Sequence, residues 1–572
     1  MTEAQSLDSP ERDQRYLQAA RLLVDAGEDD WARNILGSID SDILFDADFV
    51  DYTLMYSRIT IDDAAYFLAQ RILTNPRIEQ QWVNLNPEFV QTLRERRAEL
   101  FALLGDSTDS VNERINLSLL ALSDEERVAN QNAIWQSLMA VPQDELERLS
   151  LESTDPIAQG WYTLAAISKN NDDDISAQLH TIQRWEQQWP NHPASQSLPS
   201  DLNLLKQLVA ERPKVIGLLL PLSGPYGNTG QAVRDGFMAA YYTANGRSSF
   251  TPEVRIFDTH AQPINDIYDL AVQDGAELII GPLLKENVQE LNLRLDLPVP
   301  TLALNVVDSA YGFPTKLYQF GLPVEDEARQ IAQRAWVEGH RNAMVLVQQT
   351  ETGQRAADTF AYQWNQLGGQ VVQRSYFADQ ADYQDVVKDS LLVSDSERRA
   401  RDIRRLLGGN IKFEEPRRRQ DIDLIFMMAR PSEAQLLKPT LNFHFASNVP
   451  VYATRHIFSG TQDKEHNNDL NGIRFTTLPW FFDNYSAVAR SVKSSVNPSP
   501  AYQQFYAIGV DAYRLSPRVK QLEEVESARF YGATGVLRLN PERQIAREQE
   551  WVQIVNGVAT PLPKVVSDAY VD

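Results

Sequence analysis

Residues 214–242, KVIGLLLPLSGPYGNTGQAVRDGFMAAYY, constrain the fold more than any other stretch of the chain. An unbroken apolar run from Val215 to Leu220 leads into a turn rich in Gly, Pro and Ser. Apolar residues then recur at helical spacing on one face, at Val233, Phe237, Ala240, Tyr241 and Ala244. A short apolar run between turn signals is typical of a strand buried on both faces of a parallel sheet. We therefore predict an α/β domain over residues 214–572.

Strand and helix patterns alternate through the rest of this domain. Further strands are predicted at Val254–Phe257, Leu278–Ile280, Pro300–Leu304, Lys316–Phe320, Ala343–Val347, Gly369–Arg374, Ile422–Met427 and Val449–Tyr452. Helices are predicted near 263–274, 285–295, 324–338, 352–367, 381–393 and 431–443. Such alternation favours right-handed β-α-β units and parallel sheets covered on both faces. One small sheet would not use so many strands, so we expect two lobes, lobe A (about 214–322 and 480–527) and lobe B (about 323–479 and 528–572).

The chain before residue 190 shows helical patterns and no strand pattern. Over residues 12–190, small residues alternate with aromatic ones, as in Trp161, Ala165 and Trp185. This pattern resembles tetratricopeptide-type helical pairs, which stack because one pair cannot bury its own apolar face. An irregular helical bundle is the alternative. Pro and Ser residues then predict a linker with one short helix over 191–213, and we expect residues 1–11 to be a disordered or artificially added start.

Composition excludes several classes of function. The chain has no cysteine, which removes disulfides, thiolate catalysis and cysteine metal sites, and favours an oxidising compartment such as the periplasm. Residues 1–200 carry 15 Lys and Arg against 34 Asp and Glu, a net charge of −19, and the rest carries −5. This acidic balance argues against nucleic-acid binding. The polar start resembles no signal peptide, so we expect either a cytosolic protein or one whose export segment has been removed.

No motif in the chain predicts catalysis, a cofactor or a metal ion. The loop PLSGPYGNTGQ lacks the Lys-Ser/Thr ending of a phosphate-binding loop, and Ser223 is not in a G-x-S-x-G elbow. His260 has no evident partner that would make it a general base. Asp463 and His466 lie in a polar segment without metal-ligand spacing.

Residues 398–419, RRARDIRRLLGGNIKFEEPRRR, form the one strongly basic run, with nine basic and three acidic residues. Arg398, Arg401, Arg404 and Arg405 are spaced for one face of a helix. One interpretation is a surface that docks an acidic partner or an anionic polymer, and the other is a solvated insertion. The candidate docking residues are Arg398, Arg401, Arg404, Arg405, Arg417, Arg418 and Arg419.

Several segments resemble known families. Residues 214–242, ELIIGPLLKENVQEL and the closing YGATGVLRLNPERQIAREQEWVQIVNG resemble type I periplasmic binding proteins. HPAS and the block RRRQDIDLIFMMARPSEAQLLKPTLNFHFASNVPVYATRHIFSG are similar to the LpoA family of outer-membrane lipoproteins, which activate a class A penicillin-binding protein. The resemblance covers nearly the whole chain. It implies a helical, tetratricopeptide-like domain joined to a two-lobed α/β domain of the periplasmic binding protein type.

Two features depart from these families. The lipid-bearing cysteine of the LpoA family is missing, so a lipid anchor would lie outside this sequence. Solute-binding relatives commonly hold an amino acid with Ser or Thr hydroxyls after the third and fourth strands, where this chain has Leu283, Leu284, Lys285 and Ala303, Leu304, Asn305. A conventional amino-acid site is therefore not expected.

The resemblance implies a non-enzymatic regulator of peptidoglycan synthesis on the periplasmic side of the outer membrane of a Gram-negative bacterium. Its partners would be a bifunctional class A penicillin-binding protein and peptidoglycan, with no nucleic acid. The alternative is a periplasmic receptor that binds a small molecule between the lobes, with Ser223, Tyr226, Asp258 and Asn305 as candidate cleft residues. A hydrolase is a third, weaker hypothesis, because no catalytic constellation is present.

Overall fold

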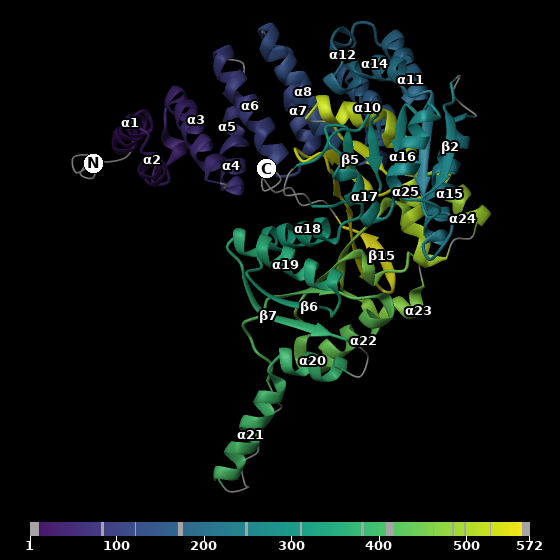
Figure 1. Cartoon of the computed structure of the whole chain (residues 1–572). Helices are drawn as coiled ribbons and strands as arrows, with labels where there is room; N and C mark the ends of the chain where they lie inside the picture. Colours follow the sequence, from purple (N-terminus) through teal and green to yellow (C-terminus); the bar gives the residue numbers. More distant parts are fainter. Residues whose placement is uncertain are drawn as a thin grey trace. The chain divides into compact units, whose positions relative to one another are not determined.

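The computed structural model describes residues 11–63, 65–81, 85–120, 122–169, 175–245, 250–308, 312–378, 382–407, 417–460, 463–482, 486–496, 499–526 and 528–562. The chain divides into two compact units (Figure 1). Unit 1 comprises residues 1–170 and 181–203, and unit 2 comprises residues 171–180 and 204–572. The expected start over residues 1–11 lies, except for Glu11, outside the described residues.

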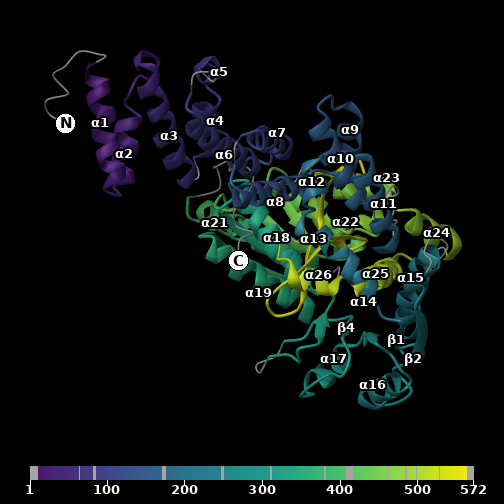
Figure 2. The same ribbon diagram turned by 90° about the horizontal axis from the view of Figure 1, so that it is seen from above.

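Unit 1 is all helical in the residues that the structure describes. Its helices are α1 (Glu11–Asp25), α2 (Asp29–Leu36), α3 (Asp46–Asp62), α4 (Tyr66–Leu73), α5 (Pro76–Gln81), α6 (Pro87–Leu103), α7 (Ser107–Leu117), α8 (Asp124–Ala140), α9 (Gln143–Glu152), α10 (Pro156–Ser168), the end of α11 (Ile175–Gln188), α12 (Pro193–Gln196) and α13 (Ser200–Asn203). Neighbours in sequence pack in pairs, α1 on α2, α3 on α4, α6 on α7 and α9 on α10. Figure 2 shows α1 to α4 following one another along the unit.

The segment predicted as a linker is folded. Pro193 begins a helix instead of interrupting one, because a first-turn Pro loses no helical hydrogen bond. Pro193 opens α12, and α14 (Leu205–Glu211) follows α13. His192 caps α12, since its Nδ1 accepts a hydrogen bond from the Ala194 N–H at 3.1 Å.

Unit 2 contains two sheets built mainly of parallel strands, as the alternating pattern predicted. In the first sheet the order is β2-β1-β3-β4-β5, and every neighbouring pair is parallel. Its strands are β1 (Val215–Leu220), β2 (Glu253–Asp258), β3 (Leu278–Ile280), β4 (Thr301–Ala303) and β5 (Leu317–Gln319). The helices of this part are α15 (Gly227–Asn245), α16 (Ile264–Gln273), α17 (Lys285–Asn292), α24 (Ala487–Val496), α25 (Gln503–Leu515) and α26 (Val519–Glu524).

Strand β1 is buried on both faces, which confirms the prediction from its apolar run. Ile216, Leu218 and Leu220 pack with residues of α15 and α25, whereas Leu219 packs with α16 and α17 on the opposite face. Helices α15 and α25 approach each other closely at two glycines. A Cβ on Gly236 would lie 2.1 Å from the Tyr506 carbonyl oxygen, and one on Gly509 would lie 2.0 Å from that of Val233.

The second sheet has the order β15-β14-β10-β9-β8-β6-β7. Strands β6 to β10 are parallel, and β14 and β15 extend the sheet antiparallel. Their bounds are β6 (Asn342–Gln348), β7 (Gln370–Phe377), β8 (Leu424–Met428), β9 (Val451–Ala453), β10 (Arg474–Thr477), β14 (Glu550–Val555) and β15 (Val558–Pro561). The helices here are α18 (Val324–Val337), α19 (Glu351–Gln366), α20 (Tyr383–Ser390), α21 (Val393–Leu407), α22 (Pro431–Leu441) and α23 (Lys464–Asn467).

A small antiparallel sheet, β11 (Phe530–Gly532), β12 (Gly535–Leu539) and β13 (Ile545–Glu548), completes unit 2. Leu537 and Ile545 of this sheet share a hydrophobic cluster with β1. The chain runs from the first sheet to the second after β5, returns after β10, and runs to the second again after β13. The predicted fold class, helical first and then α/β with two sheets, is confirmed. The exact lobe limits stay a prediction.

The helix predicted near 381–393 is present as α20, which ends at Ser390, and a further helix, α21, begins at Val393. Leu392 between them has a φ of 55°, in the left-handed region that non-glycine residues seldom adopt. The second helix therefore leaves in a new direction, and it carries the first part of the basic run.

We expect His192 to make unit 1 less stable in acid. The ring lies 5.3 Å from Trp161 and 5.1 Å from Trp185, its Nε2 donates to the Ile157 carbonyl, and burial lowers its pKa. The stability that the neutral ring contributes is complete above the unfolded pKa of about 6.5 and is lost as the pH falls below it.

Below pH 6.5 the free energy of unfolding should fall, with a slope of at most about 1.4 kcal/mol per pH unit for a single group. Hydrogen exchange of α10 measures this loss within unit 1. The variant His192→Asn keeps a capping oxygen but has no such titration, so its exchange should depend less on pH. An equal pH dependence in the variant and the parent protein would contradict the assignment.

Candidate functional site

The candidate cleft residues follow the carboxyl ends of strands in the first sheet. Ser223 follows β1, Asp258 ends β2 and Asn305 follows β4. In open α/β sheets this edge is where ligands bind, next to the point where the strand order reverses. The order β2-β1-β3 places that point between β1 and β3. The candidate residues therefore lie at the edge of the sheet where ligands bind in folds of this class, and their role in a cleft stays a prediction.

The carboxylate of Asp258 is occupied by neighbouring loop residues. Its Oδ1 accepts hydrogen bonds from the backbone N–H groups of Leu222, at 2.9 Å, and His260, at 3.0 Å. Its Oδ2 accepts one from the Ser223 hydroxyl at 2.6 Å. Burial alone would raise the pKa of Asp258, but these hydrogen bonds outweigh burial and lower it. Asp258 therefore stays ionised and joins two loops.

Asn305 has a similar internal role. Its Nδ2 donates to the Leu283 carbonyl at 2.9 Å, and its Oδ1 accepts from the Val306 N–H at 2.9 Å. Tyr226, by contrast, is 55% exposed. The four candidates thus comprise three loop-fixing side chains and one exposed ring. Among the described residues, neither Tyr226 nor Asn305 forms a hydrogen bond with Ser223 or Asp258.

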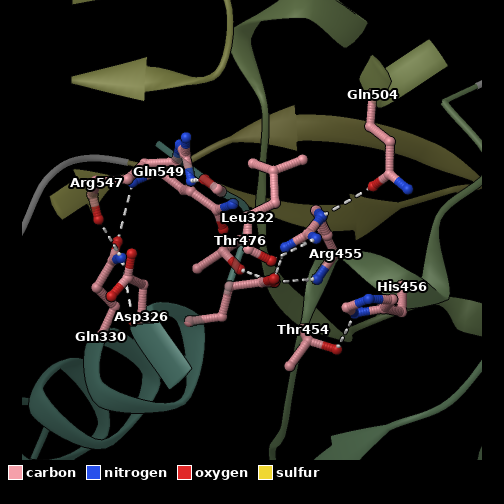
Figure 3. A network of polar contacts seen from close by, with 12 residues as sticks. Leu322, Asp326, Gln330, Thr454, Arg455, His456, Thr476, Gln504, Arg547 and Gln549 are labelled. Carbon is pink, nitrogen blue, oxygen red and sulfur yellow. Dashed lines mark hydrogen bonds and ion pairs between the residues drawn. The ribbon is translucent and has the colours of Figure 1, made fainter. Parts of the chain in front are cut away.

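A buried ionic network lies where the chain passes between the two sheets (Figure 3). Glu327 of α18 is 0% exposed and forms an ion pair with Arg455, which follows β9. Glu327 Oε2 also accepts hydrogen bonds from the Arg455 backbone N–H at 2.7 Å and from the Thr476 hydroxyl of β10 at 2.9 Å. One carboxylate thus joins a helix to two strands of the second sheet.

Arg455 reaches beyond the second sheet. Its Nη2 donates to the Leu322 carbonyl, at 3.4 Å, in the segment after β5. Its Nε lies 3.5 Å from Oε1 of Gln504, at the start of α25, which packs on the first sheet. Burial, followed by the charge of Arg547, lowers the pKa of Arg455. Its ion pair with Glu327 offsets this penalty and keeps the guanidinium charged.

Arg547 of β13 also contacts the segment that follows β5. Its Nη1 donates to the Gly321 carbonyl at 2.6 Å, and burial lowers its pKa to about 10. Gln330 of α18 holds the segment that contains Arg547 with both ends of its amide. Its Nε2 donates to the Arg547 carbonyl at 2.7 Å, and its Oε1 accepts from the Gln549 N–H at 2.9 Å. The segments between the sheets are therefore tied to one another by buried polar contacts.

The sequence patterns did not predict this network. Arg455 lies in the recognised block as YATRHIF, and Glu327 lies in a helix start rich in acidic residues, where exposure is the usual expectation. A charged residue directly after an apolar strand was the available signal for Arg455. Nothing in the sequence pairs it with a carboxylate 128 residues away.

The basic run is not one continuous surface. Arg398, Arg401, Arg404 and Arg405 lie on α21 and are exposed, as is Arg417 after the undescribed residues 408–416. Arg418 is buried, so it does not contribute to an exposed docking surface. Its Nε donates to the Phe445 carbonyl at 2.8 Å. Arg419 forms an ion pair with Asp421 at 2.7 Å.

The described residues offer no metal site of the usual kind, because no three His, Asp or Glu side chains gather to ligate an ion. Asp463 and His466 contact each other at 2.8 Å across the first turn of α23, where Asp463 is the helix cap. Within the same described ranges, no helix combines the length and the apolar character that crossing a bilayer requires.

Comparison with known proteins identifies one family. The model described as LppC putative lipoprotein matches residues 1–557. The penicillin-binding protein activator LpoA of Photobacterium profundum is 29% identical over 470 residues, which cover 81% of this chain and 76% of the relative. LpoA of Aliivibrio fischeri is 29% identical over 486 residues, covering 84% and 79%.

Solved structures are also similar. Full-length LpoA from Haemophilus influenzae is 24% identical, with a TM-score of 0.51 over 98% of this chain and 97% of that one. This match shows the fold. The C-domain of the same protein, described as a regulator of PBP1A, is 28% identical, with a TM-score of 0.50 over 61% of this chain and all of that domain.

We expect the Glu327–Arg455 pair to be costly to break from either side. Glu327→Gln or Arg455→Met leaves one buried charge without its partner, at a cost of about 3–5 kcal/mol in the free energy of unfolding. The double variant should lose clearly less than the sum of the two, because no lone charge remains.

Hydrogen exchange of residues 451–477 reports on this part of unit 2. Exchange should accelerate about 100-fold or more in each single variant. Arg374→Gln, which breaks the exposed pair with Asp358, is the control and should cost no more than about 1 kcal/mol. Additive losses in the double variant would contradict the pairing.

Proposed function

The chain belongs to the LppC family, and we propose that it is a non-enzymatic regulator of peptidoglycan synthesis that binds and activates a bifunctional class A penicillin-binding protein. The observation that carries this proposal is its similarity to penicillin-binding protein activators over four fifths of its length. The similarity of unit 2 to a domain described as a regulator of PBP1A supports the same function. We further propose a location at the periplasmic face of the outer membrane, through a lipid anchor outside this sequence.

The chemistry of the candidate cleft supports regulation without catalysis. A general base or nucleophile needs a reactive group that reaches a substrate. Asp258 instead accepts hydrogen bonds from Ser223, Leu222 and His260, and its pKa is lowered. Such a carboxylate is a weak base with little capacity for a further ligand.

The buried network supports a role for unit 2 as a rigid platform. Receptors of two-lobed architecture respond to a ligand by moving one lobe relative to the other about connecting segments. Here those segments are fixed by Arg455, Arg547 and Gln330. A rigid platform activates a partner by binding its active conformation more tightly than its inactive one.

The helical unit would serve as a spacer and scaffold that spans the peptidoglycan layer. Successive packed pairs build length without a large single core. Its strongly acidic composition keeps such a spacer soluble.

The decisive test mixes the purified chain with the class A synthase. We expect a complex with a Kd of about 1 µM, or roughly −8 kcal/mol. Glycan polymerisation and crosslinking should rise about fivefold, which corresponds to about 1 kcal/mol of activation free energy. A class B penicillin-binding protein, which has no glycan-polymerising domain, is the control. No complex, together with unchanged crosslinking, would end the proposal.

A thermal-shift screen tests the receptor alternative, which the position of Ser223 and Asp258 at the ligand-binding edge favours. A ligand present at 100 times its Kd stabilises the folded state by about 2.7 kcal/mol. We expect no shift of the unfolding midpoint with amino acids or muropeptides. A saturable shift that Asp258→Asn abolishes would instead establish a small-molecule receptor.

A further inference from the structure

Helix α21 extends away from the second sheet as a separate arm (Figure 1). Its outer part, residues 398–406, is called the arginine arm below. The Arg398 side chain is 65% exposed and that of Arg405 is 84% exposed. Leu406 is 82% exposed and Ile403 is also exposed. The arm therefore offers both charge and apolar surface to solvent.

The base of the arm is firmly held. Leu391 and Val393 belong to the hydrophobic cluster between the second sheet and α22. Lys388 of α20 forms an ion pair with Glu397 of α21 at 2.7 Å. Because these contacts end before Arg398, the base is fixed while the arm remains exposed.

The chain segment that follows the arm is anchored to the same lobe. The Arg417 N–H donates to the Ser396 hydroxyl at 3.1 Å, and the Arg419 N–H donates to the Leu391 carbonyl at 2.9 Å. Buried Arg418 donates to the Asn448 side chain at 3.0 Å. Buried Arg418 is thus part of the support, whereas Arg398 and Arg405 are exposed on the arm, where each pairs with an acid three residues earlier on α21.

The composition of the arm favours carboxylates as the group it binds. Its five basic residues are all arginines, and its single acid is Asp402. A guanidinium binds a carboxylate with two parallel hydrogen bonds, which a lysine cannot do. Ile403 and Leu406 would enter an apolar depression beside those carboxylates, as anchoring side chains do at protein interfaces.

Two observations disfavour a membrane or an anionic polymer. A helix that binds a membrane surface needs a broad apolar face, and here the exposed large apolar residues of the described arm are Ile403 and Leu406. The whole chain has a net charge of −24, which repels an extended anionic surface. A compact acidic patch on a protein would contact the arm alone, without approaching the acidic surface of the rest of the chain.

We propose that the arginine arm docks on a protein surface in which clustered carboxylates surround an apolar depression, and that this surface belongs to the class A penicillin-binding protein. The inference rests on the proposed function and adds the contact site. The arm contributes binding free energy, and activation follows from the complex.

The test uses full-length protein in which three exposed arginines of the arm become neutral. Glutamine keeps the helix propensity close to that of arginine. The set is Arg398→Gln, Arg401→Gln and Arg405→Gln. Affinity for the synthase should fall about 10-fold or more, and the salt dependence of binding should become weaker. The circular dichroism spectrum should be unchanged.

A control set removes the same charge from exposed, ion-paired arginines elsewhere, Arg127→Gln, Arg255→Gln and Arg374→Gln. Its affinity should stay within about 2-fold of the parent protein, because such exposed pairs contribute little. Equal losses in the two sets would overturn the arm as a specific site, since net charge alone would then explain binding. Leu406→Ser should weaken binding without changing its salt dependence.

The outcomes separate the two proposals. If the parent protein does not bind the synthase, the proposed function fails and the arm loses its partner. If the parent protein binds and the arm set binds equally well, the function stands and the arm proposal is overturned. A third outcome is that the parent protein binds vesicles with phosphatidylglycerol, or isolated peptidoglycan, and that the arm set abolishes this binding. The arm would then bind those anions, and the proposed protein surface would be overturned.

Discussion

The ion pair between Glu327 and Arg455 is the contact on which the arrangement of unit 2 depends. Removing two charges from water costs free energy, which is recovered only if every remaining polar contact is made. Thr476 and the Arg455 backbone supply those contacts to Glu327, while Leu322 and Gln504 lie against the guanidinium. An ion pair under these constraints tolerates few alternative arrangements. It therefore specifies how the connecting segments are placed more than it adds stability.

This constraint bears on how unit 2 would carry out the proposed function. A two-lobed domain usually senses a ligand through movement between the lobes, but buried contacts of Arg455 and Arg547 oppose such movement. The polar side chains at the usual ligand edge are likewise held by hydrogen bonds within their loops. What remains accessible is the outer surface of unit 2. An activator that acts through surface contacts needs a fixed framework, and the arginine arm would be one contact on it.

Much of the fold was predictable because local sequence encodes it. The apolar run of β1 and the one-sided pattern of α15 predicted both elements, and alternation predicted parallel sheets. The turn at Asn556–Gly557, which joins β14 to β15, carried a recognised hairpin signal that the strand prediction did not use. The break at Leu392 was not predictable, since leucine has no preference for a positive φ. Tertiary contacts impose that conformation.

The sequence by itself determined the order of helices and strands, the acidic character of unit 1 and the arginine-rich composition of α21. These properties depend on residues that are neighbours along the chain. The tertiary structure decided which charges are buried: Arg418 and Arg455 became supports, whereas Arg398 and Arg405 stayed exposed. It also decided that Ser223 and Asp258 bind each other. The environment of a polar group depends on segments that folding brings together from distant parts of the chain, and local patterns do not record them.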